Sequence, residues 1–257
     1  MALTLFGLGM LGAFTSGLVG VGGAVVMIPL LLYVPPLLSV GILDIKIVTG
    51  LTMTQVLAAA VVGTWSHGRH AHVHRALAWT GGPAMAACSL VGAVASRYVS
   101  GHALLVVFAL MATMALPLMA VTPVAPPPDA GHETVPFSRA AAVVYSGAIG
   151  LMSGLVGAGG AFLLVPVLVG LMRIPVRLSI GTSLAMVGMS AATGFVGKAA
   201  TGQVPLWASI VLVLGSLAGA PLGARVSRRL PVGALRAVLV TIIVVVMLRI
   251  WIDVFRF

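Results

Sequence analysis

Apolar runs of about 20 residues recur along the whole sequence, and each is long enough to cross a lipid bilayer as a helix. They fall near residues 3–33, 46–66, 76–95, 103–122, 140–172, 178–200, 205–224 and 232–252. Leu, Ala, Val and Ile dominate these runs, and the long polar alternation expected of barrel strands is absent from the sequence. The sequence therefore predicts an all-α polytopic membrane protein.

The composition argues against a soluble domain, because 60% of the residues are hydrophobic and only 7% are charged. Soluble domains carry about 25% charged residues. The formal net charge is +10, but the Lys and Arg residues stand mostly at the ends of the apolar runs, where such side chains anchor to lipid headgroups. We therefore expect the lipid bilayer, and no nucleic acid, as the partner of these charges. The predicted location is the bacterial inner (plasma) membrane. A homo-oligomer is compatible with the sequence, which leaves the oligomeric state open.

A proline-rich polar stretch divides the chain into two halves of four apolar runs each. We predict an N-terminal transmembrane repeat over residues 1–122, a linker over 123–139 and a C-terminal transmembrane repeat over 140–257. Gly17 aligns with Gly154 at an offset of 137 (154 − 17), and Gly50 aligns with Gly181 at an offset of 131 (181 − 50). Internal duplication of this kind is common in secondary transporters.

The first run of each half contains the same glycine-rich motif. It reads SGLVGVGGAVVMIP from Ser16 to Pro29 and SGLVGAGGAFLLVP from Ser153 to Pro166. Glycines loosen a helix and each proline removes a backbone donor, so we expect helix breaks here, with Pro29 and Pro166 contributing to them. Two arrangements fit these long runs. A broken, tilted helix that spans the bilayer makes the halves parallel, whereas a re-entrant hairpin with its apex at the glycines makes them inverted.

The glycines of these motifs are the first candidates for a binding site, because non-helical backbone at membrane depth is tolerated only where it is buried in protein or lines a cavity. The candidates are Gly20, Gly22, Gly23, Gly157, Gly159 and Gly160. Free N–H groups and the ends of half-helices at such a break would bind an anion. The alternative is that these glycines only allow close helix packing. The duplication, the excess length and the proline that follows favour a site.

Hydroxyl side chains near the start of the second run of each half form a further set of candidates. Thr52 aligns with Ser183, and Thr49 and Thr182 lie nearby. A hydroxyl donates to an anion without bringing a charge into the bilayer, and we therefore propose Thr52 and Ser183 as assisting residues. The alternative is a hydroxyl bonded to a carbonyl of its own helix.

Four histidines lie between His67 and His74 in the segment HGRHAHVHR. Their spacing would suit a divalent metal ion, so a metal-cation permease is the alternative function. We favour a solvated loop, because no acidic or cysteine ligand is near in the sequence, and we predict no metal site and no cofactor. An enzyme is not expected either, since Ser153 has no histidine in any apolar run to act as its base.

Acidic residues are limited to Asp44, Asp129, Glu133 and Asp253, all near loops or ends of runs. Transporters driven by protons or sodium usually hold a carboxylate inside the membrane. An anion that leaves a cell with a negative interior gains about 2.3 kcal/mol per charge per 100 mV, whereas uptake must be driven. The shortage of acids therefore favours export or facilitated flux of an anion.

The doubled S-G-L-V-G-x-G-G-A…P motif resembles that of the TauE/SafE family, the group of sulfite exporters and sulfonate permeases. Ile180–Ser183 (IGTS) and the G-x-V at Gly202 are similar to that family as well. The resemblance implies a membrane transporter for sulfite, sulfoacetate or a related organosulfonate. Many members carry a third consecutive glycine where this chain has Ala24 and Ala161. We predict that the small anion binds between the two repeats.

Overall fold

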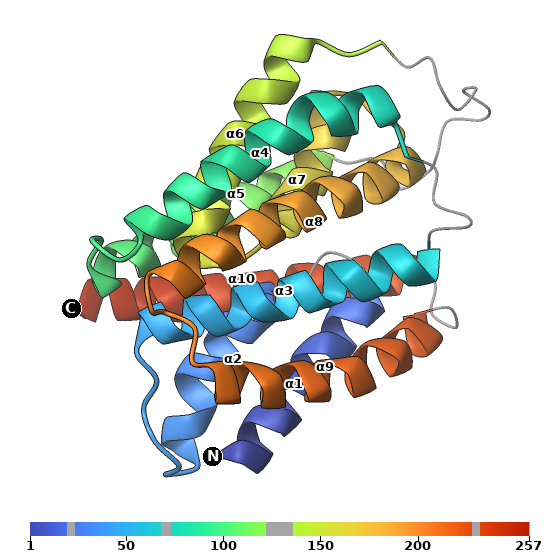
Figure 1. Cartoon of the computed structure of the whole chain (residues 1–257). Helices are drawn as coiled ribbons and strands as arrows, with labels where there is room; N and C mark the ends of the chain where they lie inside the picture. The colour runs from blue at the N-terminus through green and yellow to red at the C-terminus, as the bar shows by residue number, and fades with distance from the viewer. Residues whose placement is uncertain (20–23, 68–72, 122–135, 228–231, 257) are drawn as a thin grey trace.

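The computed structural model describes residues 1–19, 24–67, 73–121, 136–227 and 232–256 (Figure 1). Most residues in these ranges are helical and none of them forms a strand, so the all-α expectation is confirmed. The elements are α1 (Ala2–Val19), α2 (Ala24–Leu37), α3 (Ile45–His67), α4 (Arg75–Ala95), α5 (Gly101–Val121), α6 (Arg139–Val156), α7 (Ala161–Pro166), the π-helical turn η1 (Val167–Leu171), α8 (Val176–Ala200), α9 (Leu206–Ser227) and α10 (Val232–Arg256).

Five of the described helices, α4, α5, α6, α8 and α9, are long and apolar enough to cross a membrane. Long exposed apolar side chains cover the outside of the bundle, as at Trp79 and Leu206. In water such a surface would be unstable, whereas in a bilayer the lipid tails cover it. The protein is a multi-pass membrane protein.

Each long first run is divided at its glycine motif. In the second half α6 ends at Val156 and α7 begins at Ala161. In the first half α1 and α2 flank residues 20–23, which lie outside the described residues. The expectation that Pro29 breaks a helix is wrong, because α2 continues through it to Leu37. At Pro166 the α-helical pattern ends and a π-helical turn follows directly.

The second divided run, α6 to η1, begins and ends on one side of the bundle. His74 at the start of α4 packs edge-on against Phe137, just before α6, with ring centroids 5.1 Å apart. The backbone N–H of His74 also donates to Thr182 Oγ1 near the start of α8, at 2.9 Å. Since the starts of α6 and α8 both lie beside His74, the segment between them forms a hairpin.

The first divided run has the same form. α1 runs in the direction of α9, because Gly215 lies against Phe6 and Gly219 lies against Met10. α9 runs opposite to α8, to which a short loop joins it, and α8 runs opposite to α3 (Figure 1). α1 and α3 therefore run in the same direction, and α2 must return between them. Gly12 of α1 accordingly lies against Met27 of α2.

The two halves run in opposite directions. α3 and α8 are antiparallel, because Thr49 lies level with Lys198 and Met53 lies level with Gly194. The first hairpin opens on the side where α3 begins and the second opens on the side where α8 begins, which is the opposite side. Each half then holds one hairpin followed by three long helices, which is the order that the re-entrant arrangement predicts.

The starts of the helices repeat at the two sequence offsets. The hairpin helices begin 137 residues apart (139 − 2 for α1 and α6, 161 − 24 for α2 and α7). The crossing helices begin 131 residues apart (176 − 45, 206 − 75 and 232 − 101). This regularity supports a duplicated architecture.

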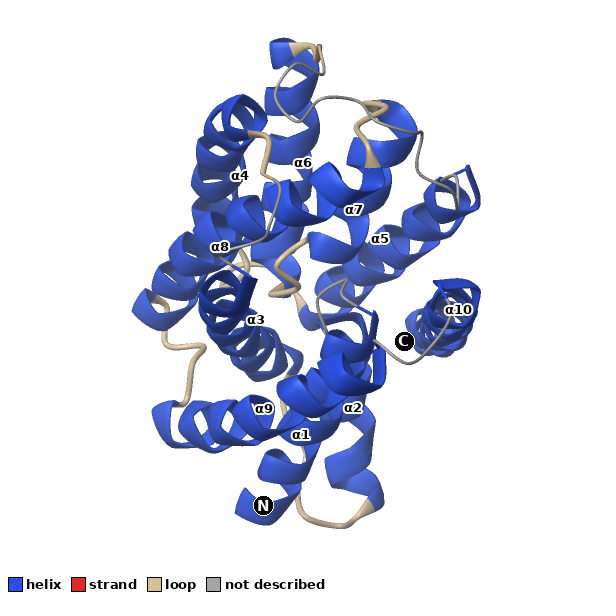
Figure 2. Ribbon diagram, turned by 90° about the vertical axis from the view of Figure 1, so that its right-hand side faces the viewer, coloured by secondary structure: helices blue, strands red, loops and turns tan. Residues whose placement is uncertain are grey.

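The most extensive helix packing lies between the halves, in the pairs α1 with α9 and α4 with α6. Figure 2 shows both pairs side by side. Glycines make this possible: a Cβ on Gly154 would lie 2.1 Å from Ser89 O, and one on Gly9 would lie 2.2 Å from Leu212 O. Small residues at membrane helix contacts allow such close approach. The first helix of each half is therefore held mainly by the other half.

Candidate functional site

The turn between α6 and α7 has a backbone that only glycine adopts readily. Gly157, Gly159 and Gly160 have φ values of 76°, 65° and 74°, in the left-handed region. All three are buried. A Cβ on Gly157 would lie 1.9 Å from the carbonyl oxygen of Thr49 in α3. The motif is therefore needed both for the turn and for its contact with α3.

Four consecutive N–H groups in this turn have no hydrogen-bond partner among the described residues. The N–H groups of Gly157 and Ala158 donate to Ser153 O, at 2.7 and 3.2 Å. Those of Leu163 and Leu164 donate to Gly160 O, at 3.1 and 2.9 Å. The N–H groups between them, from Gly159 to Phe162, donate to no described group. Buried backbone donors are nearly always paired, so this turn has donors to spare for a ligand.

A buried hydroxyl lies beside the same turn. Ser153 is 0% exposed and its Oγ has no hydrogen-bond partner. A Cβ added to Gly160 would lie 3.3 Å from the Cβ of Ser153, so the Ser153 side chain lies at the turn. An unpartnered buried hydroxyl is costly in an apolar interior, and a ligand with acceptor oxygens would satisfy it.

The two predicted assisting hydroxyls are not brought together. Thr52 lies on the face of α3 that also carries Thr49 and Val56, both of which contact the turn. Ser183 lies eleven residues before Gly194 (194 − 183), about 16 Å along α8 from the level of Met53. Thr52 is therefore near the turn, and Ser183 is not.

Both hydroxyl protons are used within their own helices. Thr52 Oγ1 donates to Val48 O at 2.8 Å and Ser183 Oγ donates to Ile180 O at 2.9 Å. This is the alternative considered from the sequence. Of the other predicted site residues, Gly157, Gly159 and Gly160 form the turn, and Gly20, Gly22 and Gly23 lie outside the described residues.

Lys198 is a functional candidate that the sequence reasoning missed. It lies near the end of α8, within an apolar run, and is 0% exposed. Its Nζ lies within hydrogen-bond distance of four oxygens, which share its three protons: Ser96 Oγ at 2.7 Å, Thr49 Oγ1 at 2.9 Å, Leu155 O at 2.9 Å and Gln203 Oε1 at 3.1 Å. The available signal was a lysine inside an apolar run, since ionisable residues there are costly and usually functional.

The histidine segment has one described side chain with a defined structural role. His74 Nδ1 accepts a hydrogen bond from Leu77 N at 3.2 Å and so caps the start of α4. Residues 68–72 lie outside the described residues, as does the side chain of His67. Among the described residues, no group of three His, Cys, Asp or Glu side chains is placed to hold a metal ion.

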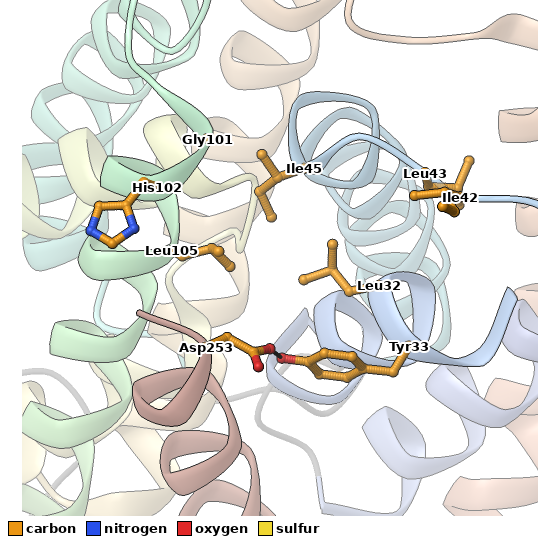
Figure 3. Close-up of a pocket in the computed structure, with 9 residues that line it drawn as sticks. All are labelled: Leu32, Tyr33, Ile42, Leu43, Ile45, Gly101, His102, Leu105 and Asp253. Carbon is orange, nitrogen blue, oxygen red and sulfur yellow. Dashed lines mark hydrogen bonds between the residues drawn. The ribbon is translucent and has the colours of Figure 1, made fainter. Parts of the chain in front are cut away.

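A cavity of about 330 Å³ lies where α2, α5 and α10 meet, and no residue of the glycine turn is among its lining residues. Tyr33 and Asp253 point toward one another in its wall, and the tyrosine hydroxyl donates to Asp253 Oδ2 (Figure 3). The other lining residues are Leu32, Ile42, Leu43, Ile45, Gly101, His102 and Leu105. This lining is mostly apolar and its charged group is a carboxylate, which would repel an anion.

Known proteins resemble this chain over nearly its whole length. The profile of the family described as Sulfite exporter TauE/SafE matches residues 5–250. A probable membrane transporter protein of Xylella fastidiosa (strain 9a5c) is 30% identical over 234 residues, which cover 88% of this chain and 85% of that protein. The probable membrane transporter protein YunE of Bacillus subtilis (strain 168) is 25% identical over 248 residues, 87% of each chain. No solved structure matches the chain.

Proposed function

The chain belongs to the TauE/SafE family of membrane transporters, and from this premise we propose that it carries a small sulfur-containing anion, sulfite or an organosulfonate. The proposed direction is export or facilitated flux across the inner (plasma) membrane of a bacterial cell. The observation that carries the proposal is the buried turn whose N–H groups from Gly159 to Phe162 have no partner among the described residues. Aligned backbone donors next to a helix start bind anionic oxygens well.

The groups around the turn suit an oxyanion. Ser153 supplies a further donor, and the Thr49 and Thr52 side chains lie on the facing side of α3. Asp44 is exposed before α3, and Asp253 is bonded to Tyr33, so neither described carboxylate lies at the turn. A sulfite or sulfonate group presents three acceptor oxygens, which the N–H groups of the turn and the Ser153 hydroxyl can help to satisfy.

The opposite directions of the halves support binding between two inverted repeats. In this proposal residues 1–122 and 140–257 are the repeats, joined by a linker over 123–139. The turn at Gly157–Gly160 enters from one side, and α1 and α2, which flank the equivalent sequence motif, enter from the other. Transporters with inverted repeats commonly bind substrate at discontinuous helices between the repeats.

The basic residues set the orientation. Among the described residues, six arginines flank the side on which the second hairpin opens; they are Arg75, Arg139, Arg173, Arg177, Arg225 and Arg236. Since cytoplasmic loops are enriched in Lys and Arg, this side is proposed to face the cytoplasm. The N-terminus and the C-terminus, which lie on the other side (Figure 1), would then face outward.

Sulfite flux from proteoliposomes tests the proposal. We expect vesicles that contain the protein to release sulfite faster than empty vesicles, and methanesulfonate to compete. Gly160→Ala should reduce this flux about tenfold or more, because its methyl group would stand at the free N–H groups. Its nearest neighbours are flexible ends, Ile149 Cγ2 at 2.8 Å and Met85 Cε at 2.9 Å, so the fold should survive.

Gly202→Ala is the matched control. Gly202 has the same φ of 74° but is exposed, with nothing within 4 Å of an added Cβ. The sulfite flux of the Gly202→Ala variant should equal that of the unchanged protein. Zinc flux in place of sulfite flux, abolished when His67, His70, His72 and His74 are replaced together, would establish the metal-permease alternative instead.

A further inference from the structure

Lys198 is a buried cation that no described carboxylate neutralises. Its four hydrogen-bond partners are two hydroxyls, one carbonyl and one amide oxygen, all of them neutral. Because the residue is 0% exposed, water does not hydrate the ammonium group. A buried charge without a counter-charge is strongly unfavourable. Ionisable residues inside a membrane protein therefore usually bind a ligand or serve another function.

The four partners come from four separate segments of both halves. Thr49 belongs to α3 and Ser96 follows α4, whereas Leu155 belongs to α6 and Gln203 lies in the loop after α8. The ammonium group therefore stands where the two halves cross. It also adjoins the glycine turn, because Leu155 lies two residues before Gly157, and Thr49 contacts both Gly157 and Lys198.

Further basic side chains lie between this cluster and the surface. Lys46 lies in the first turn of α3, where Thr49 Oγ1 donates to its carbonyl at 2.8 Å, and its Nζ donates to Arg97 O at 2.7 Å. Arg97 is exposed. Asp44 is the one described carboxylate beside them, and its Oδ1 accepts from the Lys46 N–H at 3.2 Å. Positive charge therefore gathers at this end of α3, around Lys198, and favours an anion at this depth.

We propose that Lys198 determines the charge specificity of the transporter, by attracting the anion toward the glycine turn and binding it in place of one neutral acceptor. Gln203 Oε1 is the acceptor that is displaced. Gln203 lies in a loop, and the distance from its Oε1 to Lys198 Nζ, 3.1 Å, is the longest of the four. The same Oε1 also accepts a hydrogen bond from Ser96 Oγ at 3.1 Å. The Gln203 Nε2 donates separately to Thr201 Oγ1 at 2.8 Å, so the side chain keeps one hydrogen bond when Oε1 is displaced. The inference rests on the proposed anion transport and adds the residue that selects for negative charge.

The experiment compares Lys198→Gln with Lys198→Arg in proteoliposomes. Glutamine keeps a hydrogen-bond donor toward the same oxygens but removes the charge, whereas arginine keeps the charge. Sulfite is the probe, and the concentration dependence of its flux gives KM and the maximal rate. We expect Lys198→Gln to raise KM about tenfold or more, and Lys198→Arg to stay within a few-fold of the unchanged protein. Lys46→Met, which removes one charge from the same end at a partly exposed position, should have a much smaller effect.

A second measurement reports binding without flux. Sulfite and methanesulfonate should raise the melting temperature of the purified protein and of Lys198→Arg, but not of Lys198→Gln. An unchanged KM together with an unchanged melting shift in Lys198→Gln overturns the role of Lys198. Equal losses in the glutamine and arginine variants overturn it as well, because they would show a need for shape and not for charge. A third outcome separates the two proposals. If sulfite raises the melting temperature of the unchanged protein but not of Lys198→Gln, and no sulfite flux is measured, the proposed transport is wrong and the role of the Lys198 charge in binding is supported.

Discussion

The carbonyl oxygen of Leu155 accepts a hydrogen bond from Lys198 Nζ at 2.9 Å. This bond joins the end of α6, the first helix of the second hairpin, to the end of α8. It places Lys198 beside the residue two positions before the glycine turn, in which the N–H groups from Gly159 to Phe162 have no described partner. The contact thus connects the two features on which the account of anion transport depends.

Contact between the halves should depend on single glycines in α1. A Cβ on Gly9 would lie 2.2 Å from Leu212 O, whereas one on Gly7 meets nothing within 4 Å. Gly9→Ala should therefore destabilise the protein by about 1–3 kcal/mol through overpacking. Gly7→Ala should be neutral or stabilising by up to about 1 kcal/mol, because alanine is the better helix former. Thermal unfolding in detergent measures both, and equal effects would contradict the packing of α1 on α9.

The glycine turn should tolerate no side chain at Gly157. Gly157→Ala adds the left-handed strain of about 1–2 kcal/mol to a collision with Thr49 O. Gly202→Ala adds only the strain, since its φ is similar but its surroundings are open. The melting temperature of the Gly157 variant should therefore fall well below that of the Gly202 variant. If the two variants have the same melting temperature, the turn does not pack on α3.

The free hydroxyl at the turn should matter for transport and not for stability. Ser153→Ala removes a buried hydroxyl that has no partner, so the melting temperature should stay the same or rise. The KM for sulfite should rise about fivefold, as expected for the loss of one hydrogen bond of about 1 kcal/mol. Ser190→Ala removes another buried unpartnered hydroxyl, in the middle of α8, and serves as the control. A matching rise in KM for both variants would count against a site at the turn.

The link between α2 and α10 should contribute to stability. Tyr33→Phe removes the hydrogen bond to Asp253 but keeps the ring, which lies 5.0 Å from Arg249 Cζ. The expected loss is about 1–2 kcal/mol, since the acceptor is charged. Tyr98→Phe, at an 81% exposed position, should change little. Chemical or thermal denaturation in detergent distinguishes them, and no loss in the first variant would remove this link from the account.

The hairpin arrangement makes a prediction about sidedness. With Cys88 replaced by serine, a cysteine at Arg139 and one at Arg173 should react with an impermeant thiol reagent from the same side of the membrane. A cysteine at Ser100 should react from the opposite side. If residues 139–173 instead spanned the bilayer once, the first two positions would label from opposite sides.

Much of the helical fold follows from local features of the sequence. The apolar runs predict the crossing helices, and the glycine motif predicts the break between Val156 and Ala161. The effect of Pro29 was overestimated, because α2 continues through it: in a membrane helix, neighbouring elements can satisfy the one carbonyl that a proline leaves free. Run length alone was compatible with either a spanning helix or a hairpin, so only the contacts of His74 with Phe137 and Thr182 distinguish them.

The site was harder to predict because it forms between distant segments. Thr52 and Ser183 are equivalent in the alignment of the halves, but opposite directions of the halves place equivalent residues at different depths and not side by side. Lys198 was overlooked because its partners are spread from Thr49 to Gln203, and no local pattern connects them. A lysine within an apolar run was the one available signal.

The most direct test of the central claim is sulfite flux from proteoliposomes while the membrane potential is set. A net movement of negative charge should respond to the potential by about 2.3 kcal/mol per charge per 100 mV. We predict efflux that accelerates as the interior is made more negative, and that Gly160→Ala suppresses. Sulfite flux that ignores the potential, or that requires a pH gradient, would contradict uncoupled anion transport through the glycine turn.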